Sequence, residues 1–216
     1  MLTVIARRAI TTYSDTGDLV IDLSGRPDLP AFHEALRQQR TAIGVSSART
    51  QRELPANGLV LHGDPRELPQ LLAAQAADLV QQRRRLPAGV AAHPAGCADL
   101  ILASAATPGR HRCDELLAGC ATVLRPGGYL AVATDSAAGG GRDPGAETVA
   151  HCEQLGLRYW QHIVCLLVPI ENGTLTTAHA EVRSAEARAI VVHSDLHVFR
   201  KPPAMAARST EARCAA

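Results

Sequence analysis

Two arginine-rich segments are the residues best suited to bind an anion. They contribute Arg83, Arg84, Arg85, Arg110 and Arg112. Both fall in predicted loops at or near the carboxyl ends of strands, where α/β sheets bind their ligands. Guanidinium groups at that edge could contact phosphates, although a run of charges more often forms a solvated face. We therefore treat the five arginines as candidate nucleic-acid contacts.

The cysteines and histidines do not show metal-binding spacing. The six cysteines include no C-x-x-C pair, and none lies at zinc-site spacing from a histidine. His193 and His197 are four residues apart on a predicted strand, on the same side of it, without a carboxylate cluster nearby. We expect no metal, structural histidines, and free cysteines that pack as small buried hydrophobes.

The composition excludes several classes of protein. A chain of 216 residues with 46% hydrophobic and 20% charged residues can bury one sizeable core. The net charge of +1 argues against binding nucleic acid by overall charge, and two Phe, one Trp and three Tyr are too few for a single-strand stacking platform. Without a long apolar run or a secretory signal, we expect a cytoplasmic protein with no membrane partner.

Short apolar runs alternate with helical stretches along the chain. Apolar runs bounded by turn residues predict strands at 17–23, 40–45, 58–62, 98–103, 129–133, 159–168 and 189–200. Periodicity and Pro or Gly boundaries predict helices at 30–39, 67–77, 113–124 and 146–155. This order requires parallel strands with right-handed crossovers, whereas the last two strands could pair antiparallel.

The predicted architecture is α/β, a doubly wound and mostly parallel sheet with a terminal antiparallel strand. We assign one domain to residues 1–201. Residues 81–97 are an inserted loop, because polar, Pro and Gly residues occur there without periodicity. Residues 202–216 are predicted to be a disordered tail.

The order of segments resembles the S-adenosylmethionine-dependent DNA methyltransferases that modify exocyclic amino groups, cytosine-N4 or adenine-N6. The resemblance spans most of residues 4–201. It implies the class I methyltransferase (Rossmann-like) fold and a cofactor pocket around Asp22, Gly25, Ser46 and Asp64. The matching segments are 13–22, 40–45, 63–66, 99–104, 123–130 and 197–201.

The cofactor segments depart from the family pattern. The Gly-x-Gly loop expected after the first strand is replaced by residues 23–28, with Gly25 as its one glycine. Ser46 stands where an acidic residue would accept the ribose hydroxyls, so it offers a neutral hydrogen bond instead. Asp22 could contact the cofactor or cap the following turn. Asp64 could accept the adenine amino group or simply shape a Gly-Asp-Pro turn.

The catalytic loop departs further. The family reads Ser-Pro-Pro-Tyr or Asp-Pro-Pro-Tyr, which holds the target amine and stacks a ring on the flipped base. Here the run is Ser-Ala-Ala-Thr over residues 104–107, which leaves Ser104 and Thr107 as the candidate catalytic residues. Methyl transfer needs an in-line approach of its reacting atoms, so we expect a weak or inactive enzyme.

The leading hypothesis is therefore a DNA methyltransferase-like protein or pseudoenzyme, with DNA as its partner and S-adenosylmethionine as a cofactor that it could have lost. One alternative is a non-catalytic scaffold that binds nucleic acid or another protein. Another is a small-molecule methyltransferase, which needs a cofactor pocket but no base-stacking ring. Cofactor binding separates the enzymes from the scaffold, and salt-dependent binding of duplex DNA separates the two enzymes.

Overall fold

The structure is a computed structural model that describes residues 3–46, 57–81, 95–104, 110–134, 143–167, 170–171, 174–175 and 193–203. The helices are α1 (Thr3–Tyr13), α2 (Pro30–Arg37), the 3₁₀ helix η1 (Pro65–Glu67), α3 (Leu68–Gln81), α4 (Arg110–Val123) and α5 (Pro144–Gln154). The strands are β1 (Leu19–Leu23), β2 (Thr41–Ser46), β3 (Gly58–His62), β4 (Ala98–Ser104), β5 (Leu124–Thr134), β6 (Arg158–Leu166), β7 (Ile170–Glu171), β8 (Thr174–Leu175) and β9 (His193–Arg200).

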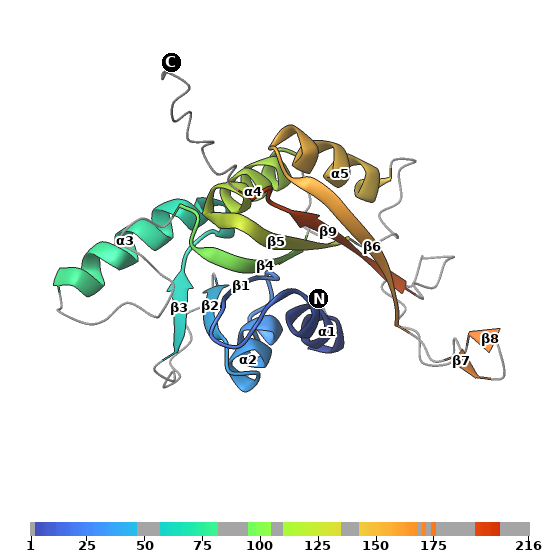
Figure 1. Cartoon of the computed structure of the whole chain (residues 1–216), viewed down its shortest axis with the longest axis horizontal. Coiled ribbons are helices and arrows are strands. Elements are labelled where there is room, and N and C mark those ends of the chain that lie inside the picture. Colours follow the sequence, from blue (N-terminus) through green and yellow to red (C-terminus); the bar gives the residue numbers. More distant parts are fainter. Residues whose placement is uncertain are drawn as a thin grey trace, which may run out of the picture.

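One seven-stranded sheet organises the chain, in the order β3-β2-β1-β4-β5-β9-β6 (Figure 1). The pairs β1–β2, β1–β4, β2–β3 and β4–β5 are parallel. Strand β9 is inserted between β5 and β6 and runs antiparallel to both. The strand order reverses between β1 and β4, which makes their carboxyl ends the topological switch point of the sheet.

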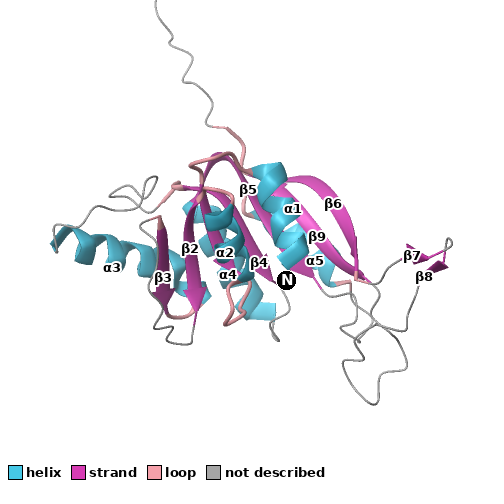
Figure 2. Ribbon diagram, turned by 90° about the horizontal axis from the view of Figure 1, so that it is seen from below, coloured by secondary structure: helices cyan, strands magenta, loops and turns pink. Residues whose placement is uncertain are grey.

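Helices cover both faces of the sheet. In Figure 1, α4 and α5 lie above the sheet and α1 and α2 lie below it. Figure 2 is seen from below, so that α1 and α2 lie in front of the sheet, and it shows the β7–β8 hairpin apart from the sheet. Each face carries its own buried cluster, one with leucines of α3 and α4 and one with residues of α1 and α2.

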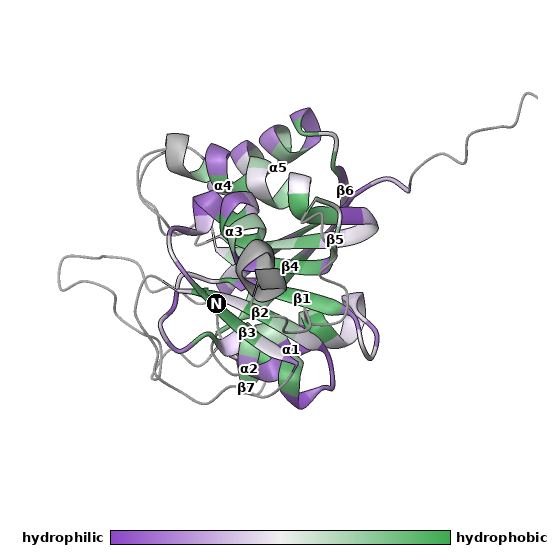
Figure 3. Cartoon of the chain, turned by 90° about the vertical axis from the view of Figure 1, so that its left-hand side faces the viewer, coloured by the Kyte–Doolittle hydropathy of each residue, from purple (hydrophilic) through white to green (hydrophobic). Residues whose placement is uncertain are grey.

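The central strands are apolar because both of their faces are covered. Every residue of β1 and of β2 is buried, as expected for parallel strands between two helical layers. Figure 3 shows hydrophobic residues concentrated on these strands and polar residues on the outer helical surfaces. At the sheet edge, β6 is mostly exposed or half-buried, and it carries half-exposed Trp160, Val164 and Leu166.

The structure confirms the predicted fold class, the seven strands and the terminal antiparallel arrangement. The sequence analysis did not predict α1. Its buried stripe of Ile5, Ala6, Ala9, Ile10 and Tyr13 has helical spacing, but four β-branched residues outside that stripe lower the helix propensity of the segment.

The boundaries of the predicted insertion and tail lie mainly outside the described residues. Helix α3 continues to residue 81, and residues 95–97 lead into β4. Residues 82–94 of the predicted loop and 204–216 of the predicted tail are not among the described ranges. The division into a 1–201 domain and a tail therefore stays a prediction.

Candidate functional site

Asp22 ties the end of β1 to the start of α2. It is fully buried, and both carboxylate oxygens accept backbone hydrogen bonds. Oδ1 accepts from the Ser24 amide at 2.8 Å. Oδ2 accepts from the amides of Ala31 and Phe32 at 2.8 and 2.9 Å. The carboxylate therefore caps a helix that begins eight residues later in the chain, in keeping with the capping interpretation.

This capping from a distance replaces the usual local cap. Leu29 occupies the N-cap position of α2 with φ of 42°, and it makes no side-chain cap hydrogen bond. Its side chain is buried over β2, since a Cβ added at Gly44 would lie 2.7 Å from Leu29 Cδ1. Burial of Leu29 compensates the left-handed backbone, while Asp22 supplies the negative charge at the helix N-terminus.

The loop after β1 leaves two features unaccounted for by internal contacts. Ser24 is 5% exposed, yet its buried hydroxyl oxygen has no hydrogen-bond partner among the described residues. Gly25 adopts a φ of +70°, and a Cβ added there would meet no atom of the described part of the chain within 4 Å. Both residues follow Leu23, which pairs with Ala103 of β4. An orphaned hydroxyl and an open stretch of backbone therefore lie at the switch point of the sheet.

Neutral hydroxyl groups end the neighbouring strands. Ser46 is the last residue of β2 and is buried, with its carbonyl accepting a bond from the Gly63 amide at 3.2 Å. Ser104 is the half-buried last residue of β4, and Thr134 is the buried last residue of β5. A hydroxyl can donate or accept a hydrogen bond, so the described ends of these three strands present neutral polar groups.

Asp64 is engaged by a neighbouring arginine. Its Oδ1 accepts bonds from the Arg66 amide at 3.0 Å and from Arg66 Nε at 2.9 Å, and its Oδ2 pairs with Arg66 Nη2. Arg66 also pairs with Glu115 at 3.3 Å. The hydrogen bond to Asp64 raises the pKa of Arg66. Asp64 therefore shapes the turn into η1, and its proposed contact with adenine stays a prediction.

The other predicted site residues lie outside the described side chains. Thr107, Arg83, Arg84 and Arg85 fall in ranges that the structure does not describe. The backbones of Arg110 and Arg112 form the first turn of α4, but their side chains are not described. The structure thus brings Asp22, Gly25, Ser46 and Ser104 to one edge, and the phosphate-binding role of the arginines stays a prediction.

Two residues at this edge were missed by the sequence analysis. Ser24 gave no signal beyond its position after a buried strand, because hydroxyl residues are common in turns. Arg66 lies two residues after Asp64, a spacing that permits pairing but does not reveal it. Within the described residues, no group of three or more His, Cys, Asp or Glu could hold a metal ion. No described helix has both the length and the apolar character needed to span a membrane.

Comparison with known proteins gives a match in structure alone. No family model and no curated protein matches the sequence. Among solved structures, the 1,6-didemethyltoxoflavin-N1-methyltransferase of Burkholderia thailandensis, solved with S-adenosylhomocysteine, has a TM-score of 0.59 at 12% identity, over 93% of this chain and 78% of that one. A SAM-dependent methyltransferase from Archaeoglobus fulgidus has a TM-score of 0.57 at 14% identity, over 92% of each chain.

This chain has the class I methyltransferase fold. The matched structures cover nearly all of it, and the sheet has one antiparallel strand next to the edge. The [4+2]-cyclase SpnF also matches, with a TM-score of 0.56 at 15% identity, over 94% of this chain and 80% of that one. A class I methyltransferase fold therefore houses more than one chemistry, and the site must decide the activity.

Proposed function

We propose that this protein is an S-adenosylmethionine-dependent methyltransferase with a small-molecule acceptor. One observation carries the proposal. The Ser24 hydroxyl without a described hydrogen-bond partner and the open backbone of Gly25 lie next to each other at the switch point. Open α/β sheets bind their ligands at this position. The matched methyltransferase structures make S-adenosylmethionine the ligand to test first.

The residues present fit the cofactor through neutral groups. Backbone without a side chain at Gly25 permits close approach of the ligand, and Ser24 offers a hydroxyl for its polar atoms. Ser46 places a second hydroxyl at the end of β2. When bound, S-adenosylmethionine supplies an electrophilic methyl group. The protein then has to align an acceptor with that methyl group and exclude water, since methyl transfer depends on positioning.

We expect modest affinity for the cofactor. The carboxylate of Asp22 is saturated by backbone amides, and that of Asp64 is paired with Arg66. Ser46 stands where the resemblance expects an acid. Hydrogen bonds to a charged group are about twice as strong as those between neutral groups, so a site built on hydroxyls binds the ribose less tightly than one with a carboxylate.

A small molecule is favoured over a DNA base because no stacking ring follows β4. The chain has six aromatic residues in all, and none of them lies in 105–109. Enzymes that flip a base out of DNA hold it between aromatic or apolar side chains. The match to a toxoflavin-type methyltransferase supports the same choice. DNA as the substrate rests on the sequence resemblance alone.

A non-catalytic scaffold is the second candidate. The engagement of both Asp22 and Asp64 within the protein favours it, because neither carboxylate is left for a ligand without a rearrangement. The two candidates differ in one measurable property. The methyltransferase binds S-adenosylmethionine and the scaffold does not.

The test is calorimetric titration with S-adenosylmethionine and S-adenosylhomocysteine, using a matched pair of variants. Gly25→Leu fills the open space at the carboxyl end of β1. Gly17→Leu is the control, because Gly17 precedes β1 at its other end, also with positive φ and with nothing within 4 Å of an added Cβ. We expect binding to the wild type and to Gly17→Leu, and loss of binding in Gly25→Leu.

Equal binding by both variants would move the cofactor away from Gly25. No binding by the wild type would favour the scaffold. A positive result leads to a transfer assay with methyl-labelled cofactor, comparing a panel of small hydroxyl and amine acceptors with duplex DNA. Label in DNA alone would restore the DNA methyltransferase hypothesis.

A further inference from the structure

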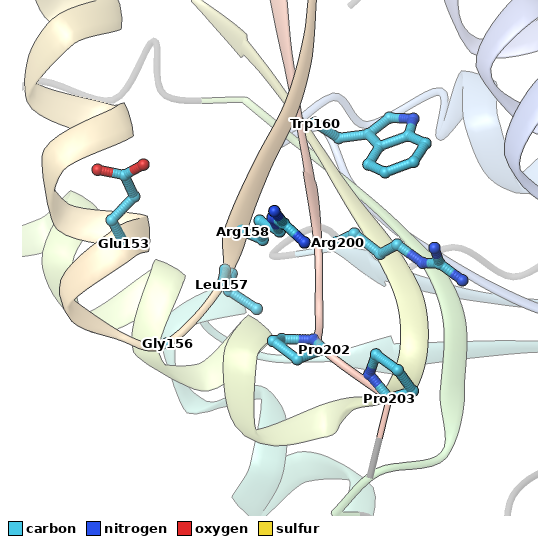
Figure 4. Close-up of a pocket in the computed structure, with 8 residues that line it drawn as sticks. All are labelled: Glu153, Gly156, Leu157, Arg158, Trp160, Arg200, Pro202 and Pro203. Atoms are coloured by element: carbon cyan, nitrogen blue, oxygen red, sulfur yellow. The ribbon is translucent and has the colours of Figure 1, made fainter. Parts of the chain in front are cut away.

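A pocket of about 440 Å³ lies at the end of the strands opposite to the candidate cofactor site (Figure 4). It forms where β6 begins and β9 ends, so it faces the amino ends of the parallel strands. Its volume is within the range of small-molecule sites. The side chains that matter for its chemistry are Arg158, Arg200, Trp160 and Glu153.

Two arginines occupy opposed positions on adjacent strands and both line this pocket. Arg158 of β6 pairs directly with Arg200 of β9 in the antiparallel register, and directly opposed residues share a face of the sheet. Like charges in that position destabilise a strand pair. Within the part of the chain that the structure describes, no carboxylate lies within ion-pair distance of either guanidinium group. An anion between them would relieve the repulsion.

The Arg200 guanidinium is held in place by two aromatic rings. Its central carbon lies 5.5 Å from the ring centres of both Tyr129 and Trp160, and its Nε donates to the Gly127 carbonyl at 3.4 Å. Stacking occupies the faces of a guanidinium and leaves its in-plane N–H groups available for an anion. The donor group is therefore oriented before any ligand arrives, which lowers the entropic cost of binding.

Trp160 adds an aromatic wall to the same side. The residue is 48% exposed, and Figure 4 shows the Trp160 ring and the Arg200 side chain on one side of the strand pair, with Glu153 on α5 at the other. Glu153 is the acidic residue among the described lining residues. The lining thus carries two positive charges and one negative charge, which favours a ligand of low negative charge.

We propose that this pocket binds a small anion attached to an aromatic ring, of the mononucleotide class. The phosphate lies between Arg158 and Arg200, and the base stacks on the exposed part of Trp160. The site is separate from the proposed cofactor site and does not depend on it, because one lies at the carboxyl ends and the other at the amino ends of the parallel strands. Its ligand is a second molecule rather than S-adenosylmethionine, which has no phosphate.

Trp160 makes the proposal directly measurable, because it is the single tryptophan of the chain. Titration with adenosine monophosphate should quench its fluorescence in a saturable way. Inorganic phosphate can contact only the arginines, and adenosine can stack only on Trp160. Each should therefore bind at least tenfold more weakly than the complete nucleotide. Arg158→Gln should weaken nucleotide binding at least tenfold. Arg8→Gln, an exposed arginine of α1 outside the pocket, should leave it unchanged.

Thermal unfolding provides a second readout that does not use fluorescence. Without ligand, Arg158→Gln should be at least as stable as the wild type, since it removes the opposed charges. With phosphate, the wild type should gain more stability than the variant. Unchanged tryptophan emission with the nucleotide, or equal nucleotide affinity in the wild type and Arg158→Gln, would overturn the proposal. Adenosine binding as tightly as the nucleotide would overturn the role of the anion.

Discussion

An aspartate lies at the end of β1 and another in the turn after β3, but the two carboxylates have different surroundings. Asp22 is buried and accepts hydrogen bonds from three backbone N–H groups, one in the loop after β1 and two in the first turn of α2. The Asp64 side chain is 33% exposed and pairs mainly with the neighbouring Arg66. The first organises a loop and a helix around a buried charge. The second caps a partly exposed turn, where water can also hydrogen-bond to the backbone.

An acidic residue at or just after the end of a strand is therefore not by itself a ligand contact. Sequence treated both aspartates as cofactor-binding candidates on the same grounds. In the structure each carboxylate already has partners, and the features left open are the hydroxyl of Ser24 and the backbone of Gly25. The comparison can be tested by removing each group and measuring what the protein loses.

The largest effect is expected for Asp22→Ala. The substitution leaves three buried amides without acceptors, and each unsatisfied buried group costs about 1–3 kcal/mol. Because such terms are not additive, we expect the free energy of unfolding to fall by about 3–5 kcal/mol. Urea unfolding followed by circular dichroism measures it. Asp22→Asn retains one oxygen acceptor and should lose less, and a loss below about 1 kcal/mol in the alanine variant would contradict the capping role.

The next largest effect is expected at His197, a buried residue whose ring nitrogens lack hydrogen-bond partners among the described residues. Neither ring nitrogen has a hydrogen bond to a residue that the structure describes, and the ring stacks on His162 with the ring centroids 4.7 Å apart. Burial, and then the neighbouring His162, lower the pKa of His197 below its ordinary 6.5. The unfolded state therefore binds the proton more tightly, and this group costs stability as the pH falls below about 6.5.

His197→Leu should remove that part of the pH dependence. Relative to the wild type, the variant should gain up to about 1.4 kcal/mol per pH unit between pH 6.5 and the lowered pKa. At pH 7 it should be at least as stable, since two unsatisfied nitrogens are gone. Urea unfolding at several pH values measures this. The exposed His33 of α2 is the control, and a parallel pH response in both variants would refute the assignment to His197.

The fold was predictable because its signals are local, whereas the site depends on contacts between distant residues. The apolar runs of β1 and β4 identify buried parallel strands without any knowledge of their partners. The capping of α2 by Asp22 depends on backbone amides nine and ten residues away. The open backbone at Gly25 depends on what does not pack against it. Sequence spacing reports neither of these properties.

The third effect concerns the open loop itself. Gly25→Ala places a Cβ in empty space but at a φ of +70°, where an L-residue is strained by about 1–2 kcal/mol. Alanine also lowers the conformational entropy of the unfolded chain, which offsets part of the strain. We therefore expect a net loss of about 1 kcal/mol in unfolding free energy. Gly17→Ala has the same features and should lose the same amount. A much larger loss at Gly25 would mean that the loop is packed.

The smallest effect on stability is expected for Asp64→Ala. A partly exposed ion pair contributes about 0.2–1 kcal/mol, and the same carboxylate makes the turn cap, which water can partly replace, so the unfolding free energy should fall by about 1 kcal/mol or less. A double-mutant cycle with Arg66→Ala in urea unfolding isolates the pair. A coupling energy comparable to the full Asp22→Ala loss would erase the contrast between the two aspartates.

The same pair of variants also tests whether Asp64 serves a ligand. Arg66→Ala releases the carboxylate from its strongest partner. If Asp64 accepts the adenine amino group, calorimetric affinity for S-adenosylmethionine should rise in Arg66→Ala and fall in Asp64→Ala. If Asp64 only shapes the turn, both variants should bind the cofactor as the wild type does. Because neither change approaches the stability cost of losing Asp22, a difference in binding between them reports on the ligand and not on the fold.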